Sequence, residues 1–320
     1  MDRPGALARL GAVVGTFADQ YLPHRATWAV ALSGGPDSLA LTAVAARIRP
    51  TTALIVDHGL QSGSAQVART ARDQALKLGC VDAQIIAVSV GTHGGPEAAA
   101  RTARYAALAD TRRSDPVLLA HTLDDQAETV LLGLGRGSGA RSIAGMQPLD
   151  APWCRPLLGV RRSSTWQACA ELGLTPWIDP HNNDARFTRA RLRSDVLPLL
   201  ENVLGGGVAE ALARTAHSMR EVTELIDDLA HQALVVCTVE AALDVAALAE
   251  LAGPVRRAVI RRWLLTGGGR GVTDVHIRAV ERLVTCWRGQ GGVAIGSSLR
   301  QQRLFAVRSG DRLQLCHEPI

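Results

Sequence analysis

Near the start of the chain stands Thr27-Trp28-Ala29-Val30-Ala31-Leu32, followed at once by Ser33-Gly34-Gly35-Pro36-Asp37-Ser38. The first run is short and apolar, which is typical of a buried strand in a parallel sheet. The residues after Ser38 are rich in alanine and leucine and predict a helix. The sequence therefore predicts a strand, a glycine turn and a helix in succession.

This turn has the features of a phosphate site. It aims backbone N–H groups and the positive end of a helix dipole at one place, and Gly34 and Gly35 let the backbone come close. Asp37 would repel phosphate unless a cation lay between them, so we interpret it as a Mg²⁺ ligand. A tight turn capped by Asp37 is the alternative. The residues expected to contact a nucleotide are Ser33, Gly34, Gly35, Pro36, Asp37 and Ser38.

Strands and helices alternate through the first 120 residues. Further strands are predicted at 52–56, 84–90 and 117–120, with helices over 5–20, 63–79 and 96–113. This order predicts an α/β fold, a Rossmann-like parallel sheet with helices on both faces. A smaller, mostly helical C-terminal domain ending in short strands is expected after Gly205-Gly206-Gly207. The predicted domains are 1–200 and 208–320.

Polar clusters follow three of the predicted strands. The glycine turn follows the first, Asp57-His58-Gly59 the second, and His121 with Asp124 and Asp125 the fourth. Ligands of such sheets bind at the carboxyl ends of the strands, so one shared site is expected there. Glu128 adds a third carboxylate at the same helix start, which suits Mg²⁺ or an ammonium-bearing substrate.

Each of these clusters also has a purely structural interpretation. Asp124 and Asp125 could cap a helix, and His121 could be a core histidine. Glu97, Arg101, Arg104 and Tyr105 stand at helical spacing, and Glu97 with Arg101 could form a surface salt bridge. The functional interpretation gives at least one of these arginines to the phosphates of ATP.

Composition and charge narrow the class of protein. The 320 residues carry 35 Lys+Arg against 30 Asp+Glu, with a pI near 9.2, which permits a nucleic-acid partner. Residues 254–288 hold eight arginines against two acids, so we expect any RNA contact of the second domain there. The six cysteines are scattered without a Cys-x-x-Cys pair, which favours reduced thiols over disulfides or zinc. No apolar run approaches a membrane span, and we expect a cytoplasmic protein.

Taken in order, the motifs resemble the tRNA(Ile)-lysidine synthetase family of the N-type ATP pyrophosphatase (PP-loop) superfamily. The resemblance covers about residues 27–198. The sequence differs from the family pattern at Thr122, where many members have histidine, and at Ala190, where many have asparagine. The matching segments are Ser33–Ser38, Asp57–Leu60, Glu97–Tyr105, His121–Thr129, Arg136–Gly139, Gly145-Met146, Arg155–Leu158 and Trp177–Arg189.

The resemblance implies a ligase that uses ATP and Mg²⁺. The wobble cytidine of a CAU-anticodon tRNA(Ile) would be adenylated at its C2 oxygen, and free L-lysine would then replace AMP at C2. The product, lysidine, converts codon reading from AUG to AUA. By motif position, the resemblance assigns catalytic roles to Asp37, His121, Asp125, Glu128 and Arg101. It also assigns Arg104, together with the residues of the turn, to nucleotide binding.

Other functions stay open at this point. A PP-loop tRNA thiolase shares the ATP turn, although such enzymes usually depend on well-placed cysteines. A glutamine-dependent amidotransferase would need an ammonia-producing domain, for which the chain has no room. A non-catalytic ATP- or RNA-binding module would not require acids and a histidine at the same strand ends. The sequence does not decide the oligomeric state, and a homodimer is one alternative.

Overall fold

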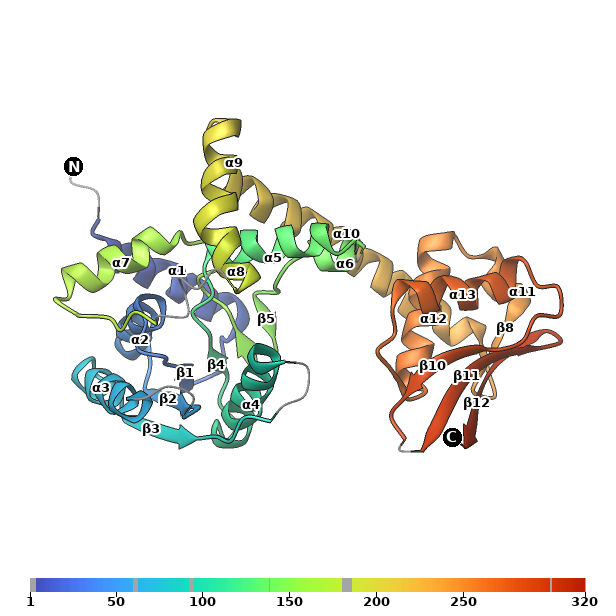
Figure 1. Ribbon diagram of the computed structural model, residues 1–320, viewed down its shortest axis with the longest axis horizontal. Helices are drawn as coiled ribbons and strands as arrows, with labels where there is room; N and C mark the ends of the chain where they lie inside the picture. Colours follow the sequence, from blue (N-terminus) through green and yellow to red (C-terminus); the bar gives the residue numbers. More distant parts are fainter. Residues whose placement is uncertain are drawn as a thin grey trace. The chain divides into compact units, whose positions relative to one another are not determined.

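The computed structural model of the chain describes residues 4–59, 63–91, 95–137, 139–179, 186–299 and 301–319. The chain forms two compact units (Figure 1). The first contains Met1–Leu132 and Gly145–Arg214, and the second contains Gly133–Ala144 and Thr215–Ile320. Each unit is built around its own sheet.

The sheet of the first unit has the strand order β3-β2-β1-β4-β6-β5. All neighbouring strands run parallel except β5, which is antiparallel to β6. The third strand ends three residues earlier than predicted, because its partner β2 ends at Asp57, opposite Ala87. The strands are β1 (Trp28–Ala31), β2 (Thr51–Asp57), β3 (Asp82–Ala87), β4 (Val117–Leu118), β5 (Leu149–Asp150) and β6 (Trp153–Cys154).

Both faces of β1 are buried because helices cover both faces of this sheet. Successive side chains of a strand point to opposite sides. Trp28 and Val30 accordingly pack in one apolar cluster with Leu41, while Ala29 packs in another with Leu108. Each large side chain buried in this way stabilises the fold by roughly 1.5–3 kcal/mol. The predicted α/β class is confirmed.

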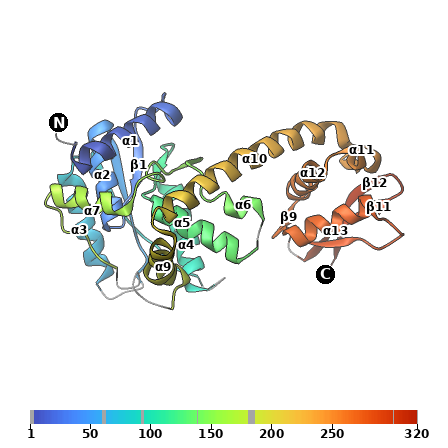
Figure 2. The same ribbon diagram turned by 90° about the horizontal axis from the view of Figure 1, so that it is seen from above.

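Three helices of the first unit form one packed group. Helices α1, α2 and α7 pack against one another (Figure 2), and α3 and α4 follow β2 and β3 in the chain. A π-helical turn, η2 (Leu192–Val196), joins α8 to α9. The bounds are α1 (Ala6–Tyr21), α2 (Pro36–Ile48), α3 (Ser64–Lys77), α4 (Pro96–Thr111), α5 (Leu123–Gly135), α7 (Arg162–Glu171), α8 (Thr188–Arg191) and α9 (Leu197–Leu204).

The second unit packs helices against an antiparallel sheet of order β7-β8-β12-β11-β10-β9. Its core includes Leu243, Ile260 and Leu304. The strands are β7 (Thr238–Val239), β8 (Ala242–Asp244), β9 (Gly269–Arg270), β10 (Val293–Ser297), β11 (Gln302–Ser309) and β12 (Arg312–Pro319). The remaining helices are α6 (Ala140–Ile143), α10 (Val208–Cys237), α11 (Val245–Glu250), α12 (Gly253–Thr266) and α13 (Asp274–Thr285).

Helix length and hydropathy give little indication of a membrane span. Within the described ranges, no single helix has the length and apolar character needed to cross a bilayer. One bent pair, Thr188–Leu204 with Val208–Cys237 at 96°, satisfies the criterion only when both helices are counted together.

Gly133 is required where α5 approaches α6. A β-carbon on Gly133 would lie 2.8 Å from the carbonyl carbon of Ser142, which is too close for backbone. We therefore expect Gly133→Ala to lower the free energy of unfolding by about 1–3 kcal/mol, as overpacking does. Gly135→Ala is the matched control, because no atom of the described residues lies within 4 Å of its added carbon. Equal denaturation curves for the two variants would contradict the close approach.

Candidate active site

The glycine turn is folded back on the helix that follows it. The Ser33 N–H donates to Ser38 Oγ at 3.2 Å, and the Ser38 hydroxyl donates to the Gly35 carbonyl at 3.0 Å. Gly34 has φ +83°, a conformation that favours glycine. Helix α2 starts at Pro36, and the first N–H groups of any helix lack intrahelical partners. The turn therefore offers donors for an anion at the carboxyl end of β1.

Asp37 is bound by the start of α7. Its Oδ1 accepts a hydrogen bond from Thr165 Oγ1, and its Oδ2 accepts one from Arg162 Nε at 3.3 Å. The N-cap of α2 is Gly35, so the alternative in which Asp37 caps the helix is wrong. Burial raises the pKa of Asp37, and the bonds from Thr165 and Arg162 oppose that rise. Asp37 faces a neighbouring helix instead of its own backbone.

Thr122 holds Asp125 at the start of α5. The Thr122 N–H and its hydroxyl each donate to Asp125 Oδ2 at 2.8 Å, and the Thr122 side chain is fully buried. Burial raises the pKa of Asp125, but Arg162 and Thr122 outweigh it and lower the pKa below its usual value. Where many relatives are expected to carry a histidine, threonine here fixes the carboxylate.

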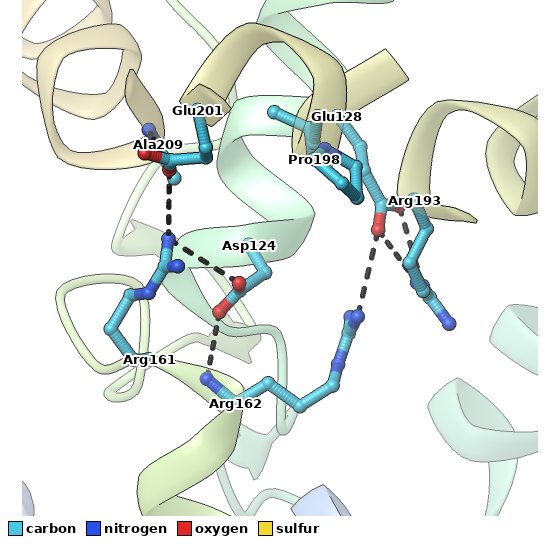
Figure 3. Close-up of a pocket in the computed structure, with 9 residues that line it drawn as sticks. Asp124, Glu128, Arg161, Arg162, Arg193, Pro198, Glu201 and Ala209 are labelled. Carbon is cyan, nitrogen blue, oxygen red and sulfur yellow. Dashed lines mark hydrogen bonds and ion pairs between the residues drawn. The ribbon is translucent and has the colours of Figure 1, made fainter. Parts of the chain in front are cut away.

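Glu128 is a fully buried carboxylate with three arginine partners. Arg193 Nε lies 2.8 Å from it, Arg189 Nη1 3.6 Å and Arg162 Nη1 3.7 Å (Figure 3 shows Arg162 and Arg193). A buried carboxylate needs such pairing, because its desolvation is costly. Two arginines of the run at 186–193, Arg189 and Arg193, thus have Glu128 as a partner in addition to any contact with phosphate.

Arg162 joins the predicted carboxylates into one cluster. Its guanidinium contacts Asp37 at 3.3 Å, Asp125 at 2.6 Å and Glu128 at 3.7 Å. Burial opposes the charge of Arg162, but these acids together raise its pKa. Its backbone N–H also donates to Asp124 at 2.7 Å. Arg162 was not among the predicted site residues, since no local pattern shows which arginine will neutralise acids that are distant in the sequence.

His121 lies beside this cluster in neutral form. Burial lowers its pKa to about 4, against the opposing charge of Asp125. Its Nδ1 is buried, and no described residue supplies a hydrogen-bond partner for that atom. This arrangement suits a hydrogen bond to a ligand better than proton uptake at neutral pH.

Arg101 and Arg104, the two arginines predicted to bind phosphate, each donate a hydrogen bond to another side chain. Arg101 Nη2 donates to the Tyr105 hydroxyl at 3.2 Å, and Arg104 Nε donates to His58 Nε2 at 3.3 Å. Arg104 therefore joins the polar cluster that follows β2. Within the described ranges, no contact places either arginine on the Ser33–Ser38 turn. The Glu97 side chain and motif residues 60, 138 and 180–185 lie outside the described part of the chain.

A cavity of about 130 Å³ opens beside the carboxylates (Figure 3). Its wall balances three acids with three arginines and includes an apolar patch. In Figure 3 the Arg161 side chain points toward both Asp124 and Glu201, at 3.4 and 3.9 Å. The lining residues are Asp124, Glu128, Arg161, Arg162, Arg193, Leu197, Pro198, Glu201 and Ala209.

The described residues offer limited support for metal binding at the turn and for thiol chemistry. Among the described residues, no group of three or more His, Cys, Asp or Glu side chains is arranged to hold a metal. Asp37 alone offers a carboxylate at the turn, which fits Mg²⁺ only when phosphate and water supply most ligands. Burial raises the pKa of Cys80, Cys154 and Cys169 to about 11, so these thiols stay protonated.

Comparison with known proteins gives a consistent result. The PP-loop domain family matches residues 12–200, and the TilS substrate binding domain family matches residues 243–314. Three similar curated proteins are each named tRNA(Ile)-lysidine synthase. The one from Mycolicibacterium paratuberculosis is 68% identical over 100% of both chains, and that from Mycobacterium tuberculosis strain H37Rv is 66% identical over 100% of both. The one from Rhodococcus erythropolis is 57% identical over 98% of this chain and 96% of its own.

One solved structure supports the fold alone. The U34-tRNA thiolase NcsA from Methanococcus maripaludis, with its 4Fe-4S cluster, superposes with a TM-score of 0.55 at 18% identity. The match covers 68% of this chain and 80% of that one.

The buried state of His121 predicts a pH dependence of stability. Its pKa is about 4 in the folded chain and about 6.5 when unfolded, so the unfolded chain binds the proton first. This contribution to stability is complete above about pH 6.5 and is lost as the pH falls toward 4. We expect it to cost about 2 kcal/mol between about pH 7.5 and pH 5.

Denaturation of the wild type and of His121→Gln at both pH values checks this. The variant should lose less stability on acidification, whereas the exposed His217→Gln should behave like the wild type. Equal losses for the wild type and His121→Gln would contradict a neutral, buried His121.

Proposed function

The chain belongs to the tRNA(Ile)-lysidine synthase family, and on that premise we propose that it joins free L-lysine to C2 of the wobble cytidine of a CAU-anticodon tRNA(Ile). The predictions of the family, the fold class and an ATP-using ligase are confirmed. One observation carries the residue-level proposal: Asp37 of the turn and Asp125 and Glu128 of α5 share one arginine.

The reaction takes two steps. The C2 carbonyl oxygen of the cytidine attacks the α-phosphorus of ATP, and pyrophosphate leaves. The ε-amine of lysine, after losing one proton, then forms a C–N bond at C2, and the C2–O bond breaks to release AMP. Activation is required because a carbonyl oxygen of the base is a poor leaving group and AMP is a good one.

For the first step we assign the nucleotide to the Ser33–Ser38 turn. Backbone N–H groups at the start of α2 and the Ser33 and Ser38 hydroxyls bind the phosphates. Asp37 would hold Mg²⁺, which when bound offsets the negative charge of the phosphates. Arg101 and Arg104 stay assigned to the nucleotide as predictions, and their present partners, Tyr105 and His58, can exchange for phosphate. His121 offers Nδ1 to the base or to a phosphate.

For the second step we place lysine in the cavity beside Glu128. A zwitterion needs both signs of charge, and Arg161 with Asp124 and Glu201 supplies them at one end. Leu197 and Pro198 form an apolar wall for the methylene chain. The ε-amine then points toward Glu128, which orients it, and its proton leaves to a carboxylate of the cluster.

The rest of the tRNA is assigned to the second domain, residues 208–320, with residues 1–200 as the catalytic domain. Of the eight arginines in 254–288, Arg256 and Arg257 pair with Glu281, and Arg278 pairs with Asp274. Four others are exposed and can contact RNA phosphates: Arg262, Arg270, Arg282 and Arg288. A homodimer and a cytoplasmic location stay predictions.

The direct test is the release of AMP and pyrophosphate from ATP with a CAU tRNA(Ile) transcript, with and without lysine. We expect lysine-dependent AMP release and a wobble nucleoside whose mass increases by one lysine minus water. Asp37→Asn should lower the rate at least about 100-fold, because it removes the charged oxygen proposed to hold Mg²⁺, the cation that would offset the charge developing on the phosphates. Asp82→Asn, an exposed position on β3, should leave the rate unchanged.

The same assay can refute the proposal. A modification that needs a sulfur donor and ignores lysine would favour the thiolase alternative instead. ATP binding without pyrophosphate release would favour the binding module.

The lysine cavity makes a separate prediction through Arg161. Replacing it with methionine removes a charge-assisted contact worth about 1.5–3 kcal/mol, so the KM for lysine should rise about 10- to 100-fold. Pyrophosphate release without lysine should not change, because Arg161 contacts no residue of the turn among its described partners. Arg191→Met, at an exposed ion pair with Asp195, is the control. A raised KM for ATP with an unchanged KM for lysine would place lysine elsewhere.

A further inference from the structure

Arg162 is the first residue of α7, and the two-step reaction as described assigns it no task. Its side chain is 18% exposed and lies between the nucleotide turn and α5. Three of its nitrogen atoms face three different carboxylates: Nε faces Asp37, Nη2 faces Asp125 and Nη1 faces Glu128. A lysine ammonium is a single point of charge and cannot span these positions with the same geometry.

We propose that Arg162 is a positioning residue that couples the two half-sites: it holds Asp37 in the absence of nucleotide and yields it to Mg²⁺ when nucleotide binds. Throughout, it keeps Asp125 and Glu128 in place for lysine. This inference rests on the proposed function, because it takes Asp37 as the carboxylate that meets Mg²⁺.

The lengths of the two side-chain hydrogen bonds of Arg162 to these acids indicate which one is released. Arg162 makes two side-chain hydrogen bonds to these acids, at 2.6 Å to Asp125 and at 3.3 Å to Asp37. Shorter charge-assisted bonds are the stronger ones. Its backbone N–H bond to Asp124 also ties the start of α7 to α5. The contact to Asp37 is therefore the weaker hydrogen bond and the first to exchange.

The surrounding residues keep the α5 acids in place during this exchange. Asp125 has two bonds from Thr122, and Glu128 has Arg193 and Arg189. Asp37 keeps its bond from Thr165, a fully buried residue of α7. Loss of the Arg162–Asp37 contact alone thus frees one oxygen of Asp37 and leaves the remaining geometry supported.

This arrangement predicts competition between Arg162 and the metal. Without Arg162, Asp37, Asp125 and Glu128 would lie close together with less positive charge between them, and a divalent cation would be attracted more strongly. Arg191 provides the control, since its described partner is Asp195, in an exposed ion pair, and not one of these three acids.

The test titrates Mg²⁺ alone, without nucleotide, into the wild type, Arg162→Met, Arg162→Lys and Arg191→Met, and follows the unfolding temperature. We expect Mg²⁺ to raise the unfolding temperature of Arg162→Met, in which three carboxylates have lost their shared cation, with a midpoint at least about tenfold below any midpoint of the wild type. Arg191→Met should match the wild type, and Arg162→Lys should lie between. Identical titrations for the wild type and Arg162→Met would overturn the proposal.

The second readout is kinetic. Arg162→Met should lower the kcat of pyrophosphate release without lysine and raise the KM for lysine, whereas Arg191→Met should change neither. Partial recovery of kcat in Arg162→Lys is expected, and no difference between Lys and Met would count against a positioning role. If Arg162→Met does not fold, Arg162→Gln, which retains two donors, takes its place in both measurements.

These outcomes separate the inference from the proposed function. A wild type that makes no lysidine refutes the function, yet the Mg²⁺ titrations still decide whether Arg162 competes with the metal at Asp37.

Discussion

Everything at the carboxyl edge of the first sheet depends on keeping several acids charged in a partly buried place. Glu128 is fully buried, and the side chain of Asp125 is 16% exposed. Such groups stay ionised only when cations and donors lie close by. Arg162 from α7, Arg189 from α8 and Arg193 from η2 supply those cations. This requirement links three later helical segments to the start of α5. Through Asp37, it also brings the Ser33–Ser38 turn into the same cluster.

The parallel sheet brings the Ser33–Ser38 turn and the start of α5 to one edge. Strand β1 delivers the Ser33–Ser38 turn, and β4, its neighbour in the sheet, delivers His121 and Thr122 to the same edge. The π-helical turn at Leu192–Val196 carries Arg193, and such turns occur frequently at functional sites. Arg162, which lines the cavity between α5, α7 and α9, also contacts Asp37 of the turn, and the proposal that both steps share one site rests on this connection.

How much the sequence could predict follows from the range over which each signal acts. The turn, the alternation of strands and helices, and the positions of His121, Asp125 and Glu128 are local patterns, and they predicted the sheet and the place of the acids. The pairing of Arg162, Thr165 and Arg193 with those acids is long-range, and no local pattern gives the partner. Thr122 was noted only as a difference from the family pattern, yet it fixes Asp125 through two hydrogen bonds. In the second unit, short strands were predicted near the end of the chain, but their assembly into one antiparallel sheet depends on pairing between distant segments.

The most direct test of the account is a crystal structure of the chain with a non-hydrolysable ATP analogue, Mg²⁺ and lysine. The account predicts phosphate oxygens within hydrogen-bond distance of the backbone N–H groups of Gly35, Asp37 and Ser38, and the lysine ε-amine in the cavity beside Glu128. Nucleotide bound away from the Ser33–Ser38 turn, or lysine bound outside the cavity lined by Asp124, Glu128 and Arg161, would contradict a single shared site.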